Sequence, residues 1–492
     1  MVHSKKALLS LLAAFTLLSS CSQHDEIDSG LAKVEKTSQD NANVKFQFIT
    51  NASSSETRST AEESDERPTS GMENEYQVND VRVYLYGSSS KQFVKSIPLS
   101  GIKRLPLTAD GNRVIYTTDR ISVPIGIYDV FVIANYGNDD NYNKVIKEKE
   151  DEFLATVDSV TYHGGLIKDI SKGIVMTNRA SDNYGVTITE NQNTTDNVIE
   201  INLERTLARI DVSTTKDVYE LKKDPISETY ATVKLDRYYI VNLPRYYNMF
   251  RHTAVLTSLV EPSSWSVTEN FGRINDVNGY AIDPYFFRKE VDATQFTNAD
   301  DYYANFYGDF NKETVAWETL TTQLSSSYSL ENCMFQPAQK NGYSTGVIFN
   351  ARITPKKVLD RYNNEITDEQ QFPETLYYFN YKFYDSEEAL DAAAANAISE
   401  TSIRKFKKTA EGYRCYYKYW IRHLDNGDDT AMGVMEFGIV RNNLYDVKVN
   451  EVKGLGYDDL ILIPDTPDES ETDLNVILRV KPWIVRKLNI TL

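Results

Sequence analysis

The clearest fold signal in the sequence lies near the middle of the chain. From Val198 to Val212 it reads Val-Ile-Glu-Ile-Asn-Leu-Glu-Arg-Thr-Leu-Ala-Arg-Ile-Asp-Val. Ile199, Ile201 and Leu203 alternate with polar residues, which is the period of a strand with one buried face. We therefore predict a long strand here, with a domain boundary just before or within it.

Further strand-like runs occur on both sides of this stretch, separated by turn residues. They lie at 81–86, 126–135, 232–241, 346–353, 415–421 and 444–449. Short strands punctuated by turns are typical of a β-sandwich. Helical patterns are few, and we expect them only at 144–157 and 386–398. The sequence thus predicts an all-β protein with minor helices.

Composition narrows the classes of function. The formal net charge is −18, with 33 Tyr but only 5 His and 3 Cys. An acidic surface repels phosphate backbones, so nucleic acid is not an expected partner. Tyrosine favours strands, while few His and Cys leave little material for metal or nucleophile chemistry. We expect no cofactor, no metal, no catalytic residues and no enzyme activity.

The N-terminus has the pattern of an export signal. Lys5 and Lys6 precede an apolar run from Ala7 to Leu18, which is shorter than the roughly 20 residues of a membrane-spanning helix. The sequence Leu18-Ser19-Ser20-Cys21 then resembles a bacterial lipobox. We expect residues 1–20 to be a lipoprotein signal peptide and Cys21 to be acylated. The alternative is a plain signal peptide with an incidental cysteine.

Two unusual features follow at the ends of the remaining chain. Val44, Phe46 and Phe48 share one face of a predicted strand, and residues 51–71 after it form a polar tract without hydrophobic period. Such a tract is an exposed loop and a site for proteolysis. A strand divided from the body by a cuttable loop suggests that the loop is meant to be cut.

The C-terminus ends in a second long alternating pattern. Residues 464–473 are acidic and contain proline, which predicts a flexible linker to a segment at 474–492. In that segment the apolar residues at even positions are Leu474, Val476, Leu478, Val480, Ile484, Leu488, Ile490 and Leu492. The strand would either close its own sheet or reach a neighbouring molecule.

Two other patterns have ordinary explanations. Gly342 to Gly346 match the hydrolase pattern G-x-S-x-G, but a strand follows where that motif needs a helix. Cys333 and Cys415 could form a disulfide in an exported protein or stay as buried thiols, and the sequence leaves both open.

Several motifs together resemble a known family. These are the lipobox at Cys21 and the stretches at 203–209, 351–357, 440–445, 453–457 and 480–485. In order and approximate spacing they resemble the fimbrillins, or type V pilins, of Bacteroidales. Within that family the likeness is nearest to the shaft subunit of the minor (short) fimbriae.

The resemblance implies a fold and an assembly route. It implies two transthyretin-like β-sandwich domains with an extended C-terminal donor strand. The implied parts are a signal peptide (1–20), a propeptide with a removable first strand (21–58), an N-terminal domain (59–200), a C-terminal domain (201–463), a linker (464–473) and a donor segment (474–492). An arginine-specific protease would cut between Arg58 and Ser59, because proline follows the other loop arginine, Arg67. The strand with Val44, Phe46 and Phe48 would leave, and the donor segment of another subunit would replace it.

The expected function is thus that of a structural subunit of a cell-surface fimbria that supports adhesion, biofilm formation and virulence. Its implied partners are copies of itself, the protease, accessory tip and anchor subunits, and host or bacterial receptors. The precursor would be lipid-anchored in the outer membrane before it enters the extracellular fimbrium. The alternatives are a tip or anchor component of the same fimbria, or a glycan-binding surface lipoprotein.

Overall fold

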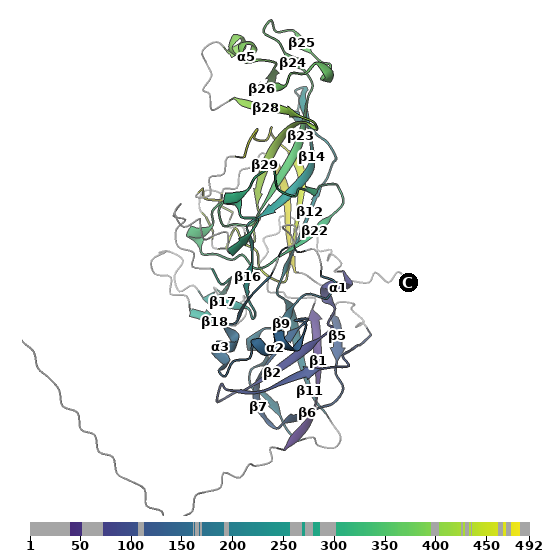
Figure 1. Ribbon diagram of the computed structural model, residues 1–492, viewed down its shortest axis with the longest axis vertical. Coiled ribbons are helices and arrows are strands. Elements are labelled where there is room, and N and C mark those ends of the chain that lie inside the picture. Colours follow the sequence, from purple (N-terminus) through teal and green to yellow (C-terminus); the bar gives the residue numbers. More distant parts are fainter. Residues whose placement is uncertain are drawn as a thin grey trace, which may run out of the picture. The chain divides into compact units, whose positions relative to one another are not determined.

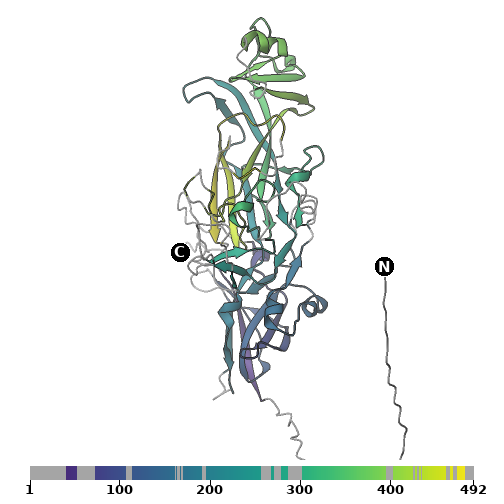
Figure 2. The ribbon, with the colours of Figure 1, turned by 90° about the vertical axis from the view of Figure 1, so that its left-hand side faces the viewer.

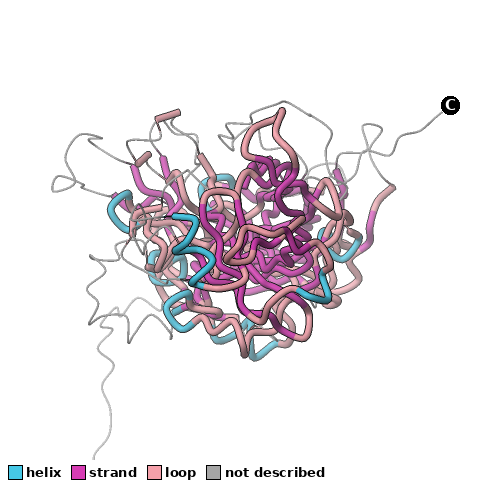
Figure 3. Tube along the Cα trace, turned by 90° about the horizontal axis from the view of Figure 1, so that it is seen from above, coloured by secondary structure: helices cyan, strands magenta, loops and turns pink. Residues whose placement is uncertain are grey.

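The structure is a computed structural model. It describes residues 40–51, 72–106, 113–160, 162, 167, 170–190, 196–255, 268–270, 279–285, 302–394, 403–424, 427–428, 432–433, 435–460, 466–468 and 474–482. The described part is mostly strands, with few and short helices (Figures 1 and 3), so the all-β prediction is confirmed. None of the helices within these ranges is long and apolar enough to cross a membrane.

The N-terminal part is built on one ten-stranded sheet. Along the sheet the order is β3-β2-β7-β9-β11-β1-β5-β4, with β10 paired to β7 and β6 paired to β1. The strands are β1 (Asn41–Asn51), β2 (Val81–Gly87), β3 (Phe93–Leu99), β4 (Lys103–Arg104), β5 (Arg113–Thr117), β6 (Ile121–Pro124), β7 (Gly126–Ala134), β9 (Met176–Asn178), β10 (Val186–Ile188) and β11 (Asn197–Arg205).

One apolar cluster holds this sheet together. It takes inward side chains from β2, β3 and β7 in one half of the sheet and from β1, β5 and β11 in the other. Because the two halves share one core, they face each other as the layers of a sandwich. On the outer side of β2 and β7, a second cluster rich in aromatic rings lies under α2 (Asp139–Lys144) and α3 (Glu150–Leu154).

The predicted long strand at 198–212 is two strands. β11 ends at Arg205 in the first sheet, and β12 (Ala208–Thr214) belongs to a different sheet. Thr206 and Leu207 form the break, where the backbone N–H and hydroxyl of Thr206 both donate to the carbonyl oxygen of Val175 at 3.0 Å. These bonds replace the ladder partners that a continuous strand would have had.

The C-terminal part has two facing sheets. A four-stranded sheet has the order β22-β12-β30-β31, and a ten-stranded sheet has the order β13-β14-β23-β29-β28-β26-β27-β24-β25, with β21 paired to β14. Their strands are β13 (Tyr219–Lys222), β14 (Thr229–Val241), β21 (Glu318–Thr319), β22 (Ser325–Ser329), β23 (Gly346–Pro355), β24 (Val358–Leu359), β25 (Glu365–Ile366), β26 (Thr375–Phe379), β27 (Lys382–Tyr384), β28 (Arg404–Thr409), β29 (Gly412–Trp420), β30 (Asn443–Val452) and β31 (Leu474–Pro482).

Side chains of both sheets meet in the largest apolar cluster, which includes Val212, Phe349, Val447 and Leu474. This shared core makes a second sandwich, and Figure 2 shows β30 and β31 in yellow side by side. Cys333 and Cys415 are both buried thiols and neither is in a disulfide, so the thiol alternative holds.

Short elements complete the described chain. Residues 243–304 contribute small pairings of β15 (Leu243–Pro244), β16 (Tyr246–Asn248), β17 (His252–Val255), β18 (Thr268–Asn270), β19 (Gly279–Ile282) and β20 (Tyr303–Ala304), with β16 paired to β8 (Val157–Ser159). The helix expected at 144–157 is wrong, because α2 ends at Lys144, α3 begins at Glu150 and Val157 is in β8. The Ala-rich helix is present as α5 (Glu387–Ala394).

Candidate functional site

The first strand, β1, lies inside the N-terminal sheet and not at its edge (Figure 1). On one side it pairs in parallel with β11, from Val44 opposite Asn197 to Thr50 opposite Leu203. On the other side it pairs antiparallel with β6 over its first half and with β5 over its second half. Removal of β1 would therefore leave unpaired backbone groups on both neighbours.

The side chains of β1 fill the N-terminal core. Val44, Phe46 and Phe48 are all 0% exposed, and the two Phe rings stack at a centroid distance of 6.3 Å. The predicted alternation of this strand is confirmed. Burial of a large apolar side chain stabilises a fold by roughly 1.5–3 kcal/mol. If β1 leaves, the groove that these three side chains filled is exposed to water, and the exposure costs the sum of three such contributions.

Polar contacts fix the register of β1. The backbone N–H of Phe46 donates to Oγ1 of Thr118, and the N–H of Thr118 donates back to the carbonyl oxygen of Phe46, each at 3.1 Å. Lys45, on the outward face, lies 3.1 Å from Asp196. A replacing strand must satisfy the same Thr118 pair, because buried backbone groups need partners.

The processing residues expected from the sequence lie outside the described residues. These are Cys21, Arg58 and Ser59. The chain is described again at Met72, where α1 (Glu73–Tyr76) begins.

The helix α1 is attached to the C-terminal sandwich by a buried carboxylate. Nη1 of Arg209, on β12, lies 3.0 Å from Oε1 of Glu75, and the hydroxyl of Tyr328, on β22, donates to the same oxygen at 2.8 Å. Nε of Arg205 donates to the carbonyl oxygen of Glu75 at 2.5 Å. The segment directly after the predicted cleavage loop is thus held independently of β1.

A second buried charge cluster lies near this one. Arg441 pairs with Glu331 at 2.7 Å, and Arg251 and Arg179 both reach Glu204, at 3.0 and 3.1 Å. Burial raises the pKa of the Glu204 carboxyl, but the arginines outweigh this effect and the pKa is lowered. The Glu204 carboxylate therefore stays ionised between them.

These charged residues explain two motifs to which the sequence alone gave no role. The stretch 203–209 supplies Glu204, Arg205 and Arg209, and the stretch 440–445 supplies Arg441 and Asn442, whose side-chain oxygen accepts from Nη1 of Arg205 at 3.1 Å. The one sign of these buried pairs in the sequence was the number of charged residues within strand-like runs. Charges in such runs are buried only when they are paired.

The structure places the first half of the C-terminal segment in its own subunit. β31 pairs antiparallel with β30, from Leu474 opposite Val452 to Pro482 opposite Asn443, and Leu474 is buried in the shared core. Val476 and Leu478 pack against the same core, while Val480 is paired with Tyr445. Ile484, Leu488, Ile490 and Leu492 lie outside the described residues.

The predicted linker before β31 has a docked section. The carbonyl oxygen of Thr466 accepts from the N–H of Asn341 at 2.9 Å, and the N–H of Asp468 donates to the carbonyl oxygen of Gln339 at 3.3 Å. Asp468 is buried, and burial raises the pKa of its carboxyl to about 8, only partly offset by Ser344 and Lys418. At neutral pH this carboxyl is therefore largely protonated.

The stretch 342–346, which matches the hydrolase pattern G-x-S-x-G, has a structural role. Ser344 is buried within the described chain, and Gly346 begins β23. Of the three histidines of the body, His252 and His423 are buried, and His163 lies outside the described residues. No group of three or more His, Cys, Asp or Glu within the described ranges has the geometry to hold a metal ion.

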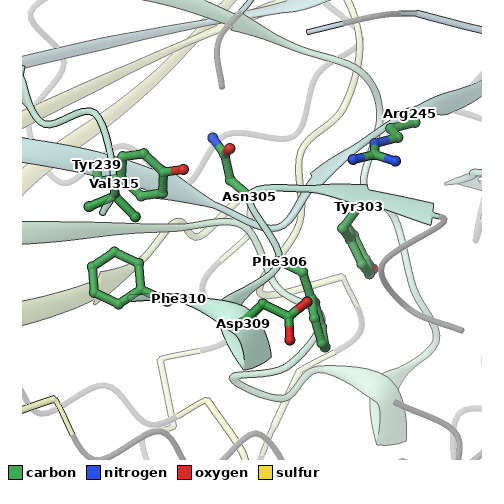
Figure 4. A pocket seen from close by; sticks show the side chains of 8 residues that line it. All are labelled: Tyr239, Arg245, Tyr303, Asn305, Phe306, Asp309, Phe310 and Val315. Carbon is green, nitrogen blue, oxygen red and sulfur yellow. The ribbon is translucent and has the colours of Figure 1, made fainter. Parts of the chain in front are cut away.

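One pocket, of about 350 Å³, lies beside β14 and β20 (Figure 4). Tyr239, Val315 and Phe310 stand on one side of it and Tyr303 and Phe306 on the other. Tyr303 is 1% exposed and Phe306 6%, so these rings offer almost no face to a ligand.

The comparisons with known proteins agree with this fold. Residues 42–222 match the family described as major fimbrial subunit protein (FimA). Residues 409–489 match the family described as major fimbrial subunit protein type IV, fimbrillin, C-terminal. The first match contains β1 and the second contains β30 and β31, and together they span more than half of the chain.

Among solved structures, the chain is distantly similar to fimbrial proteins. A fimbrilin of Porphyromonas gingivalis has 16% identity, with 91% of this chain and 98% of that chain covered and a TM-score of 0.43. The tip fimbrial protein Mfa3 of the same species, with a C-terminal truncation, has 12% identity, with 90% and 100% covered and a TM-score of 0.37. No match was found among curated proteins.

The all-β fold and the two sequence matches define a subunit of a surface fibre. The chain belongs to the fimbrillin family of fimbrial subunit proteins. Its place is therefore a fimbria on the cell surface.

Proposed function

We propose that this chain is the building block of a fimbria that polymerises by exchange of β1. It would be exported as a lipoprotein acylated at Cys21, cut between Arg58 and Ser59 by an arginine-specific protease, and completed by the C-terminal segment of another subunit. Within the fimbria it would support adhesion and biofilm formation. Accessory tip and anchor subunits would join the same fibre, and their roles are the alternative for this chain.

The observation that supports the proposal best is the position of β1. It is internal, paired on both sides and filled with buried Val44, Phe46 and Phe48, yet it is joined to the body through the one loop that carries Arg58. Once the loop is cut, β1 is no longer joined to the body, and a strand from another subunit can take its place between the same two neighbours, as in β-strand addition. Exchange from one subunit to the next is head-to-tail, which gives an open fibre and no closed ring.

The pairing of β31 narrows the part of the C-terminal segment that could be donated to another subunit. Leu474 to Pro482 are paired with β30 of their own subunit, so the free candidates are residues 483–492. Their apolar residues at even positions, Leu488, Ile490 and Leu492, have the spacing of Val44, Phe46 and Phe48. We propose that residues 483–492 are the part that enters the groove, while β31 tethers them to the donor.

A polymerisation assay tests the proposal. Precursor lacking residues 1–20 is treated with an arginine-specific protease, and ladders that collapse on heating are sought on a gel. The expected result is a ladder for the wild type and none for a variant lacking residues 483–492. A matched control replaces the half-buried, odd-numbered Asn475 of β31 with Ser and should keep the ladder. An unchanged ladder after the deletion would overturn the donor assignment.

A further inference from the structure

A third cluster of charged side chains, in the N-terminal sandwich, has no part in the proposed strand exchange. It consists of Lys91, in the turn between β2 and β3, Asp129 on β7, and Glu150, the first residue of α3. Nζ of Lys91 contacts Oδ2 of Asp129 directly and lies 3.3 Å from Oε1 of Glu150. An amine, a carboxyl group that could acylate it and a second carboxyl group thus meet at one point.

The backbone of Lys91 is held in place for this contact. Its φ is +55°, in the left-handed region that non-glycine residues rarely adopt. Its N–H donates to the carbonyl oxygen of Gly87 at 2.7 Å, and its own carbonyl oxygen accepts from the N–H of Glu150 at 3.0 Å. A strained residue that the surroundings fix so tightly is the kind of outlier from which a function is inferred.

The two oxygens of Asp129 have different environments. Oδ1 accepts from the backbone N–H of Gly185 at 2.7 Å, while Oδ2 faces Lys91. The Asp129 side chain is 0% exposed and that of Glu150 is 8% exposed, whereas the Lys91 side chain is half exposed. Nζ also lies 4.9 Å from the centroid of the Tyr184 ring. The two carboxyl groups are therefore shielded from water, while the lysine side chain reaches them from the surface.

We propose that Lys91 and Asp129 form an intramolecular isopeptide bond, with Glu150 as the proton-transfer residue. Nζ would attack Cγ of Asp129, and Oδ1 would carry the developing negative charge against the N–H of Gly185. The new bond is Nζ–Cγ and the broken bond is Cγ–Oδ2. The Lys91 ammonium loses two protons, and both leave with Oδ2 as one water, so atoms and charge balance without a co-reactant.

The resting state of the cluster is an ion pair. Burial disfavours the Lys91 ammonium, but the neighbouring carboxylates outweigh burial and raise the pKa of Lys91. Burial likewise opposes the Asp129 carboxylate, but Lys91 in turn helps to lower the pKa of Asp129. Glu150 must therefore take a proton from the ammonium before Nζ can attack.

Burial and the neighbouring Asp129 raise the pKa of Glu150 to about 7. A group with a pKa near the ambient pH can both take a proton from the amine and return it to the leaving oxygen. Fixed proximity lowers the barrier to the attack, because well-oriented intramolecular reactions reach effective molarities of about 10⁵–10⁸ M.

The bond would stabilise the half of the N-terminal sandwich whose strands are not exchanged. It would tie the turn between β2 and β3 to β7, and these three strands are neighbours in the sheet. They would then stay together while β1 is absent. The inference does not rest on strand exchange, because the bond could form in the precursor whether or not it polymerises.

Intact-mass spectrometry of the purified full chain tests the proposal. The wild type should be lighter than its sequence by one water, and Lys91→Arg, which keeps the ion pair but has no amine to acylate, should have its full sequence mass. Tryptic mapping should give one branched peptide joining residues 91 and 129. Glu150→Gln should lower the fraction of the chain that is joined.

Lys103→Arg is the matched control, because Lys103 pairs with Asp119 at 2.8 Å on the exposed surface of the same sandwich. It should keep the loss of water. A wild-type chain at its full sequence mass, with tryptic cleavage after Lys91, would overturn the proposal. So would a loss of water that maps to other residues, since that would be cyclisation of an Asp. The polymerisation assay would be unaffected by either result.

Discussion

Glu75 and Arg209 form a buried ion pair in which Oε1 and Nη1 are 3.0 Å apart, and it joins α1 to β12. The pair lies just after the loop that carries Arg58 and just after the break between β11 and β12. It therefore holds the start of the retained chain against the C-terminal sandwich. Loss of β1 can then open a groove in one sheet without releasing the segment that follows the cut.

Removal of the Glu75 carboxylate should destabilise the chain strongly. Glu75→Ala leaves Arg209 with Asp211 alone and Tyr328 without its acceptor, and loss of one partner of a buried pair costs about 3–5 kcal/mol. Urea unfolding should show this decrease in the free energy of unfolding. Glu73→Ala, which removes a surface pair with Arg104, should change it by less than about 1 kcal/mol. Equal effects of the two variants would contradict a structural role for the buried pair.

Truncation of a β1 side chain should affect only the uncut protein. Phe46→Ala should lower the free energy of unfolding of the precursor by about 3–5 kcal/mol, because it empties a fully buried site. After cleavage the strand is gone, so fibres formed from the variant should melt at the same temperature as wild-type fibres. Thermal melting of both forms checks this. Gln47→Ala, on the outward face of β1, is the control and should change neither form.

The cut should depend on Arg58 and not on Arg67. Arg58→Ala should leave the chain uncut by an arginine-specific protease and unable to form ladders, while Arg67→Ala should be processed like the wild type. N-terminal sequencing of the product, which should begin at Ser59, measures this. If Arg67→Ala alone prevented the cut, the site would be wrong but the exchange would remain possible.

The carboxyl of Asp468 should make the chain less stable as the pH rises. Its pKa is raised from 3.8 to about 8 by burial, so the folded chain binds a proton that the unfolded chain releases between these values. The free energy of unfolding should therefore fall from about pH 4 to pH 8. Asp468→Asn should remove this part of the pH dependence and stabilise the chain by about 1–3 kcal/mol at pH 8. Asp217→Asn, at an exposed position, should keep the wild-type slope.

Much of the fold follows from alternation. The strand character of β1 and β31 could be predicted because Val44, Phe46 and Phe48, like Leu474, Val476 and Leu478, repeat with a period of two. The two halves of the C-terminal segment could not be distinguished by this pattern, because a strand in its own sheet and a donated strand need the same alternation.

The buried charge pairs of Glu75 and Arg441 could not be predicted, because their partners are far away in the sequence. Glu75 meets Arg209 and Tyr328, and Arg441 meets Glu331. A buried charge looks like an exposed one until its partner is known. The break at Thr206 was missed for the same reason, since its hydrogen-bond acceptor is the distant Val175.

The most direct test of strand exchange places cysteines on both sides of the proposed contact. Glu200, on β11, is opposite Gln47 of β1, so a donated strand would bring an outward residue beside it. Glu200→Cys is combined with cysteine at position 485, 487, 489 or 491, one at a time, and disulfides between subunits are measured before and after the arginine-specific cut. We predict cross-linked dimers for at least one position, formed only after the cut. No cross-link at any of the four positions, or equal cross-linking before the cut, would contradict the account.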